Sequence, residues 1–75
     1  MDQNKLGTYL KEMYSNAPEG YQVANIHLFG IKYADDILKN KYKVIDIVRA
    51  SGLKKSYATE VSKGIKLSKY VVIKD

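Results

Sequence analysis

The side chains best suited to chemistry gather in one stretch, where hydrogen-bonding groups alternate with positive charge. They are Lys54, Lys55, Ser56, Tyr57, Thr59, Glu60, Lys63 and Lys66. Ammonium and hydroxyl groups donate to base edges and to phosphate oxygens, and a carboxylate accepts from the amino group of cytosine. The chemistry that this set suits is therefore recognition of a polyanion rather than bond breaking.

Groups that could catalyse a reaction are few. His27 is the single histidine, there is no cysteine, and no serine stands in a glycine-flanked elbow, so a nucleophilic constellation lacks its parts. His27 lies in an apolar stretch, and we expect it to be packed and hydrogen-bonded internally. Asp35 and Asp36 would point about 100° apart on a helix, which suits a solvated face better than acid–base work. We expect neither an enzyme nor a cofactor.

Charge is divided unevenly along the chain, whose formal net charge is +5. Residues 1–38 hold three basic and five acidic side chains, whereas residues 39–75 hold ten basic and three acidic ones. Such an excess favours binding to polyanions, because it releases counterions condensed on phosphate. Lysine-rich surfaces also serve simply to keep small proteins in solution, so charge alone leaves both interpretations open.

Length and composition indicate one small folded domain, residues 1–75, near the lower size at which a single apolar core sustains a fold. The hydrophobic fraction of 45% and the charged fraction of 28% argue against wholesale disorder. No apolar run approaches the roughly 18 residues that cross a bilayer, and the first residues lack the apolar core of a signal peptide. We expect a cytoplasmic protein with no membrane partner.

Two helices are predicted before residue 40. Apolar side chains at helical spacing indicate a first helix over residues 4–16, capped by Asp2 or Asn4 and ended by the turn at residues 17–20. A second helix is predicted over residues 21–40, bent or broken near Gly30, and a short strand over residues 26–33 is the alternative. Residues 26–31 are apolar nearly all round, which indicates burial in the core or in a subunit contact.

The spacing of residues 47–64 suits two short helices joined by a tight turn. Gly52 stands where the first of them must end, because glycine adopts the left-handed conformation of a helix C-cap at little cost. Leu53 would fill the angle between the helices. Ala58 and Val61, three residues apart, share a face that can pack on Ile47 and Val48. This pattern predicts a helix-turn-helix over about residues 43–64.

The last residues read differently. After Gly64 the helical pattern fades, and Val71, Val72 and Ile73 form a β-branched cluster. We expect a short helical turn around residues 67–70 and then an extended tail. Because a lone strand needs a partner, the tail would fold back on the core or pair with the tail of a second copy.

Several elements of the helix-turn-helix segment form a familiar pattern: the turn glycine and the apolar residue after it, a serine-tyrosine pair, an apolar residue, and a closing lysine-glycine. These are Gly52, Leu53, Ser56, Tyr57, Val61, Lys63 and Gly64. With them, residues 44–64 resemble the phage-repressor-like helix-turn-helix family. Three positions depart from the family's pattern: Val48 replaces a small residue, Ser51 an apolar one, and Ala58 a larger branched one.

The resemblance implies that the second helix reads duplex DNA. Carried over residue by residue, base edges would be met by Lys54, Lys55, Ser56, Tyr57, Thr59 and Glu60. Lys63, Lys66 and Lys69 suit phosphate contacts, which Lys41, Lys43 and Arg49 would extend. Tyr57 has an alternative role, which is to cover the junction of the helices.

The sequence therefore predicts a mainly all-α domain of four helices with an extended C-terminal tail. Its predicted function is sequence-specific binding of double-stranded DNA, as in a small transcriptional regulator. A homodimer through residues 26–31 or residues 71–73 would let two modules read two half-sites. Two alternatives remain, a protein-interaction adaptor on the same core and a nucleic-acid-binding accessory protein without sequence preference.

Overall fold

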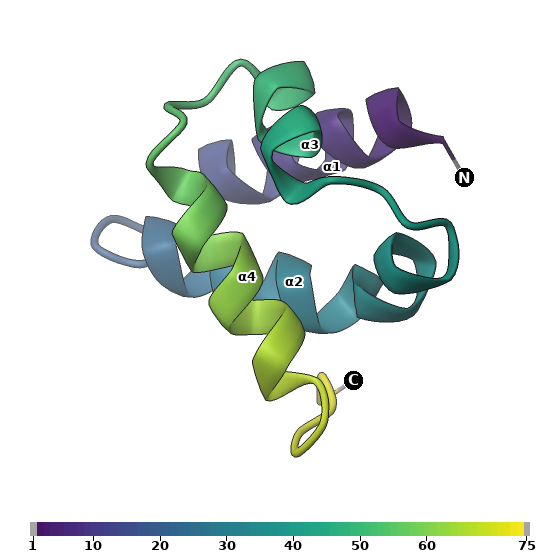
Figure 1. Ribbon diagram of the computed structural model, residues 1–75. Coiled ribbons are helices and arrows are strands. Elements are labelled where there is room, and N and C mark those ends of the chain that lie inside the picture. The colour runs from purple at the N-terminus through teal and green to yellow at the C-terminus, as the bar shows by residue number, and fades with distance from the viewer. Residues whose placement is uncertain (1, 75) are drawn as a thin grey trace.

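A computed structural model describes residues 2–74, so Met1 and Asp75 of the predicted domain lie outside the described residues. Four helices follow one another, and the described residues contain no strand. They are α1 (Gln3–Ser15), α2 (Gln22–Lys39), α3 (Val44–Ser51) and α4 (Tyr57–Leu67). Figure 1 shows α4 crossing in front of α2, with α1 and α3 side by side above them. The predicted all-α fold of four helices is confirmed.

The first helix begins where its cap predicts. Of the two candidates, Asp2 is the N-cap, and its carboxylate accepts a hydrogen bond from the amide of Lys5 at 2.8 Å. This bond satisfies one of the amides that the first turn leaves unpaired. Leu6 and Leu10 lie on the inner face of α1 and are fully buried.

The second helix runs unbroken through Gly30. Both the predicted break at Gly30 and the alternative strand over residues 26–33 are wrong, because α2 is continuous from Gln22 to Lys39. Ile26, Phe29 and Ile37 recur at helical spacing and are buried together. Helical burial of this stripe outweighs the β propensity of the individual residues.

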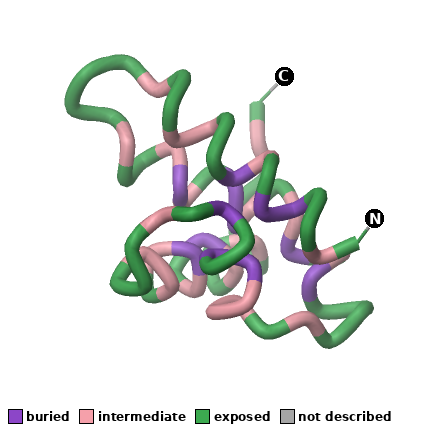
Figure 2. Tube along the Cα trace, turned by 90° about the horizontal axis from the view of Figure 1, so that it is seen from above, coloured by how far each residue is buried: buried purple, intermediate pink, exposed green. Residues whose placement is uncertain are grey.

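One apolar core joins all four helices. Its fully or almost fully buried members are Leu6, Leu10, Ile26, Phe29, Ile37, Ile47, Val48 and Val61. Ala58 and Leu53 pack against this cluster from the helix-turn-helix, as the sequence predicts. Figure 2 shows the buried positions gathered inside the trace and the loops outside it.

The third helix ends as expected at Gly52, which is its C-cap in the left-handed conformation with φ of 76°. Ser51 is buried rather than facing water. Its hydroxyl donates to the carbonyl of Val48 and accepts from the amide of Leu53 at 3.1 Å. The side chain thus acts as a cap, which explains how a polar residue occupies a position that is usually apolar.

The fourth helix lies unusually close to the second, because two glycines face each other at their crossing. A Cβ built on Gly64 would overlap the carbonyl oxygen of His27 and lie 2.9 Å from the Cα of Gly30. A Cβ on Gly30 would lie 2.9 Å from the Cα of Gly64. Backbone therefore meets backbone at this point, which only glycine permits.

The chain after α4 makes the predicted helical turn, in which the amide of Tyr70 donates to the carbonyl of Leu67 at 2.9 Å. Residues 71–74 follow without regular structure, and they form no strand among the described residues. No helix in the described part of the chain is long and apolar enough to cross a membrane.

Replacing Gly64 by alanine tests whether the fold depends on the close approach of α2 and α4. Overpacking a tight contact costs about 1–3 kcal/mol, which exceeds the gain of up to about 1 kcal/mol in helix propensity. We expect Gly64→Ala to lower the free energy of unfolding in urea, although alanine is the better helix former.

The control is Thr59→Ala on the exposed side of the same helix, which should change the free energy of unfolding by less than about 0.5 kcal/mol. A Gly64→Ala variant as stable as this control would show that the two helices do not depend on the close approach.

Candidate nucleic-acid interface

The outer face of α4 carries a row of exposed polar side chains. Val61 and Gly64 are buried against the core, so the opposite side of the helix faces solvent. Thr59, Lys63 and Lys66 follow one another there at intervals of four and three residues, and all three are exposed. We call these three residues the α4 stripe. Their spacing keeps them on one face, ready to contact a single partner.

Lys54, Lys55 and Ser56 lie in the loop before α4 rather than in its first turn, where the sequence interpretation put them. The carbonyls of Lys54 and Lys55 accept from the amides of Tyr57 and Ala58, each at 3.0 Å, and form a turn that leads into the helix. Leu53, just before this turn, is half-buried and packs against the core. All three side chains are exposed.

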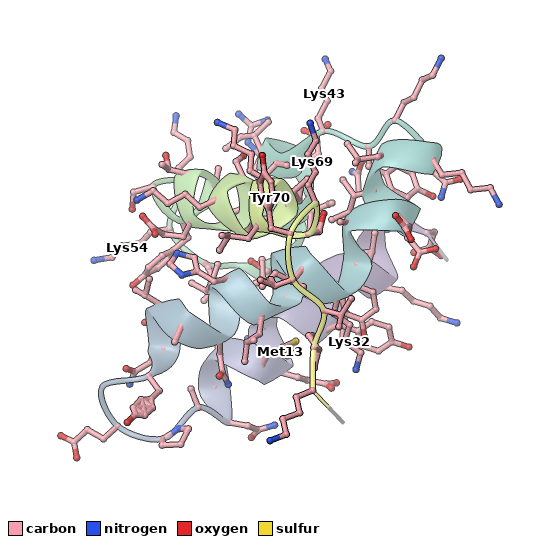
Figure 3. The ribbon with its side chains drawn as sticks, turned by 90° about the horizontal axis from the view of Figure 1, so that it is seen from below. Met13, Lys32, Lys43, Lys54, Lys69 and Tyr70 are labelled. Atoms are coloured by element: carbon pink, nitrogen blue, oxygen red, sulfur yellow. The ribbon has the colours of Figure 1, made fainter. Side chains whose placement is uncertain are left out.

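Further lysines flank the α4 stripe. Lys41 and Lys43 are exposed in the connection between α2 and α3, and Lys69 is exposed just after α4. Figure 3 shows Lys43 and Lys69 pointing to the same side of the molecule, with Lys54 at the opposite end of α4 from Lys69. Arg49 on α3 is also exposed, and its Nη1 lies 3.8 Å from Oδ1 of Asp46.

Tyr57 connects the start of α4 to α1. Its ring lies 5.4 Å from the ring of Tyr14, centroid to centroid, and the two hydroxyls share a hydrogen bond of 3.2 Å. This hydrogen bond raises the pKa of Tyr14 above its ordinary value. Tyr57 is half-buried. The ring and hydroxyl of Tyr57 thus pack against Tyr14 of α1.

Glu60 is held by the protein itself. Its Oε1 lies 2.8 Å from Nε2 of His27 on α2, and its Oε2 lies 3.5 Å from Nζ of Lys63. The hydrogen bond with His27, helped by Lys63, lowers the pKa of Glu60. His27 is therefore internally hydrogen-bonded, as predicted. A carboxylate engaged in this way is less available to a cytosine than the sequence implied.

The pairing of His27 with Glu60 was missed from the sequence, because the two residues lie 33 positions apart on different helices. A shallow apolar depression of about 340 Å³ beside the pair was also missed. Its lining comes from α2, α4 and the turn after it: His27, Lys63, Lys66, Leu67 and Tyr70. The sequence held one indication of this pairing. His27 precedes Gly30 by three residues, so both lie on the face of α2 that meets α4.

Helices α3 and α4 follow one another, with the left-handed Gly52 and a short loop between them, and α4 carries an exposed basic face. The model of the HTH-like domain family matches residues 2–74. The chain belongs to this family. No curated protein and no solved structure matches it. The match supports helix-turn-helix membership as such, and it does not single out the phage-repressor group.

Family membership gives the geometry a context. In helix-turn-helix domains the second helix lies in the major groove of DNA while the first crosses the backbone. The sequence predicts that α3 and α4, which span residues 44–67, are these two helices. Membership of the family suggests DNA as the partner.

The contact between Glu60 and His27 has a consequence for stability at low pH. A carboxylate whose pKa is lowered by folding contributes stability above its ordinary pKa of 4.5, and this contribution is lost as the pH falls through the folded-state value. We expect Glu60→Gln to be less stable than the parent at about pH 7. The difference should shrink at about pH 3, as measured by urea unfolding.

Glu12→Gln is the matched control, because Glu12 is an exposed glutamate on α1. It should unfold at nearly the parent's urea concentration at both pH values. A Glu60→Gln variant that differed from the parent equally at both would show that the ionised carboxylate is not the stabilising group.

Proposed function

We propose that this HTH-like domain binds double-stranded DNA with sequence specificity, as a small transcriptional regulator of the cytoplasm similar to the phage repressors. In this proposal α4 lies in the major groove, and the α4 stripe faces the bases. The observation that carries the proposal is the stripe itself, three exposed polar side chains on the outer face of α4. A threonine hydroxyl and lysine ammonium groups are suitable donors to base edges and phosphate.

Charge supports the same assignment. Glu60 is the one acidic residue of α4, and its carboxylate is paired with His27 and Lys63. Repulsion between this carboxylate and phosphate is thereby reduced, since part of its charge is compensated within the protein. Lys54 and Lys55 before α4 and Lys69 after it extend the positive surface at both ends. Such a surface favours a polyanion over a neutral protein partner.

The adaptor alternative would dock a protein partner on the face of the core that carries Tyr57. In the structure the hydroxyl and the ring of Tyr57 are both engaged by Tyr14. This contact leaves less of the Tyr57 side chain available to a protein partner. We therefore favour DNA recognition through Thr59, Lys63 and the lysines of the preceding loop.

One module of this size offers a limited interface, and useful specificity normally requires two modules on two half-sites about one helical turn apart. We propose that the protein acts as a homodimer. The sequence nominates residues 26–31 and residues 71–73 for that contact.

Enrichment of random duplexes on the purified protein tests the proposal. Specific binding predicts that a recurrent sequence survives and that an excess of random DNA fails to displace it. Equal displacement by random and enriched duplexes would support the non-specific alternative. No affinity beyond a weak, salt-sensitive attraction would support the adaptor.

The double variant Lys55→Ala, Thr59→Ala should weaken binding to the enriched duplex at least tenfold. The reason is that a good base contact contributes about 1–3 kcal/mol of discrimination. Its matched control is Thr8→Ala, Lys11→Ala, which changes the same residue types at exposed positions of α1. Titrations by fluorescence anisotropy compare the two. If both double variants bound like the parent, the reading face would be wrongly assigned.

Lys69→Ala probes phosphate contact rather than base reading. We expect its affinity for enriched and random duplexes to fall by a similar factor. The slope of log K against log salt should become less steep by about 0.9, the value for one lost phosphate contact. Lys5→Ala on α1, likewise exposed, should leave the slope unchanged. A loss of affinity confined to the enriched duplex would instead place Lys69 on a base.

A further inference from the structure

Helix α2 has a second apolar face besides the one in the core. Leu28, Ile31 and Leu38 are spaced at intervals of three and seven residues, which places them on one side of the helix. Leu28 is 38% exposed and Leu38 61% exposed, whereas Ile31 is half-buried. Residues 26–31, which are apolar nearly all round the helix, therefore place some side chains in the core and others at the surface.

The C-terminal tail lies against this second face. Val71, Val72 and Ile73 line a groove of about 300 Å³ together with residues of α2 that include Ile31 and Asp35. Figure 3 shows the tail crossing α2. Val72 is 89% exposed. The two segments nominated for a subunit contact therefore border one surface, which we call the α2–tail face: Leu28, Ile31, Leu38, Val71 and Val72.

The tail also has unused hydrogen-bonding capacity. Along the described chain, the last backbone hydrogen bond joins the amide of Val71 to the carbonyl of Leu67 at 3.1 Å. Within residues 2–74, the amides of Val72 and Ile73 have no backbone partner. An extended, apolar segment of this kind is a template for pairing with another chain.

We propose that the α2–tail face is the homodimer interface of this protein, and that a second copy occupies it through a two-fold axis. This inference rests on the proposed function, which requires two modules. Charge complementarity identifies the occupant. Lys32 and Asp35 line the same groove one helical turn apart, and a two-fold axis passing between them would set each lysine against the aspartate of the other copy. A face that is complementary to itself in this way fits a second copy of the chain.

The position of the face agrees with DNA reading by a dimer. In Figure 3 the tail crosses α2 on the side toward the viewer, while Lys43 and Lys69 point toward another edge. Dimerisation would therefore leave Lys43 and Lys69 of both copies uncovered. The molecule measures 32 × 28 × 20 Å, so equivalent points of two adjacent copies can lie about 34 Å apart, one turn of DNA.

Sedimentation equilibrium of the full chain without DNA tests the interface. We expect the parent to dimerise, and Leu28→Glu and Val72→Glu each to raise the dimer dissociation constant at least about tenfold, because a charge replaces apolar contact. Val23→Glu is the control, since Val23 is a 41% exposed apolar residue of α2 outside the face. It should leave the constant unchanged.

Charge reversal examines the two-fold arrangement. Lys32→Glu should weaken the dimer, because it sets two acidic groups against each other across the axis. The double reversal Lys32→Glu, Asp35→Lys should restore it. A parent that is monomeric at about 100 μM would overturn the inference and leave the face to another partner. Equal effects of Val23→Glu and Leu28→Glu, or no rescue by the double reversal, would also overturn it.

The test of the dimer interface and the test of DNA binding can give different results. If the parent is monomeric yet binds its enriched duplex, the interface is wrong and DNA recognition stands. If the parent dimerises as described and binds no duplex, the interface stands and DNA recognition is wrong.

Discussion

The contact between Gly30 and Gly64 is the constraint on which the rest of the structure depends. At this crossing α2 and α4 meet backbone to backbone, and neither position has room for a Cβ. Burying one side of α4 so closely decides which side faces outward. The exposed α4 stripe, the contact of Glu60 with His27 and the placement of the tail over α2 all follow from this approach.

Three further contacts hold α4 in place along its length. Tyr57 joins the start of the helix to Tyr14 of α1, Glu60 joins its middle to His27 of α2, and Val61 lies in the core. These contacts come from different helices, so they fix the rotation of α4 as well as its position. In the proposed complex, a helix that is fixed before binding would lose less conformational entropy when it meets DNA.

The pairing of Glu60 also changes the character of the surface. An unpaired carboxylate among lysines would offset part of their attraction for phosphate. Here the Glu60 carboxylate accepts a hydrogen bond from His27 and lies beside Lys63, so it contacts the basic face from its inner side. The same residue therefore links the stability of the α2–α4 contact to the electrostatics of the proposed DNA-binding side.

Features set by neighbouring residues could be predicted from the sequence. Gly52, Asp2 and the apolar periodicity of the helices act over a few positions, and the structure confirms each of them. The sequence also predicted that Val61 would be buried, because its spacing from Ala58 defines an inner face.

Features set by contacts between distant segments could not be predicted. Gly30 suggested a bend because glycine weakens helices locally, yet its role is to let α4 approach. Gly7 on α1 likewise lies where a Cβ would overlap Ala50 of α3, a contact between segments far apart in the sequence. The start of α4 at Tyr57, after a loop that holds Lys54, Lys55 and Ser56, was likewise not visible in the local spacing.

Chemical-shift mapping with an enriched duplex is the most direct measurement of whether the outer face of α4 binds DNA. The amide signals of Thr59, Lys63 and Lys66, together with those of Lys54 and Lys55, are expected to move during the titration. Signals of α1, on another side of the core, should stay in place. Shifts that spared α4 and its preceding loop while changing α1 would contradict the assignment.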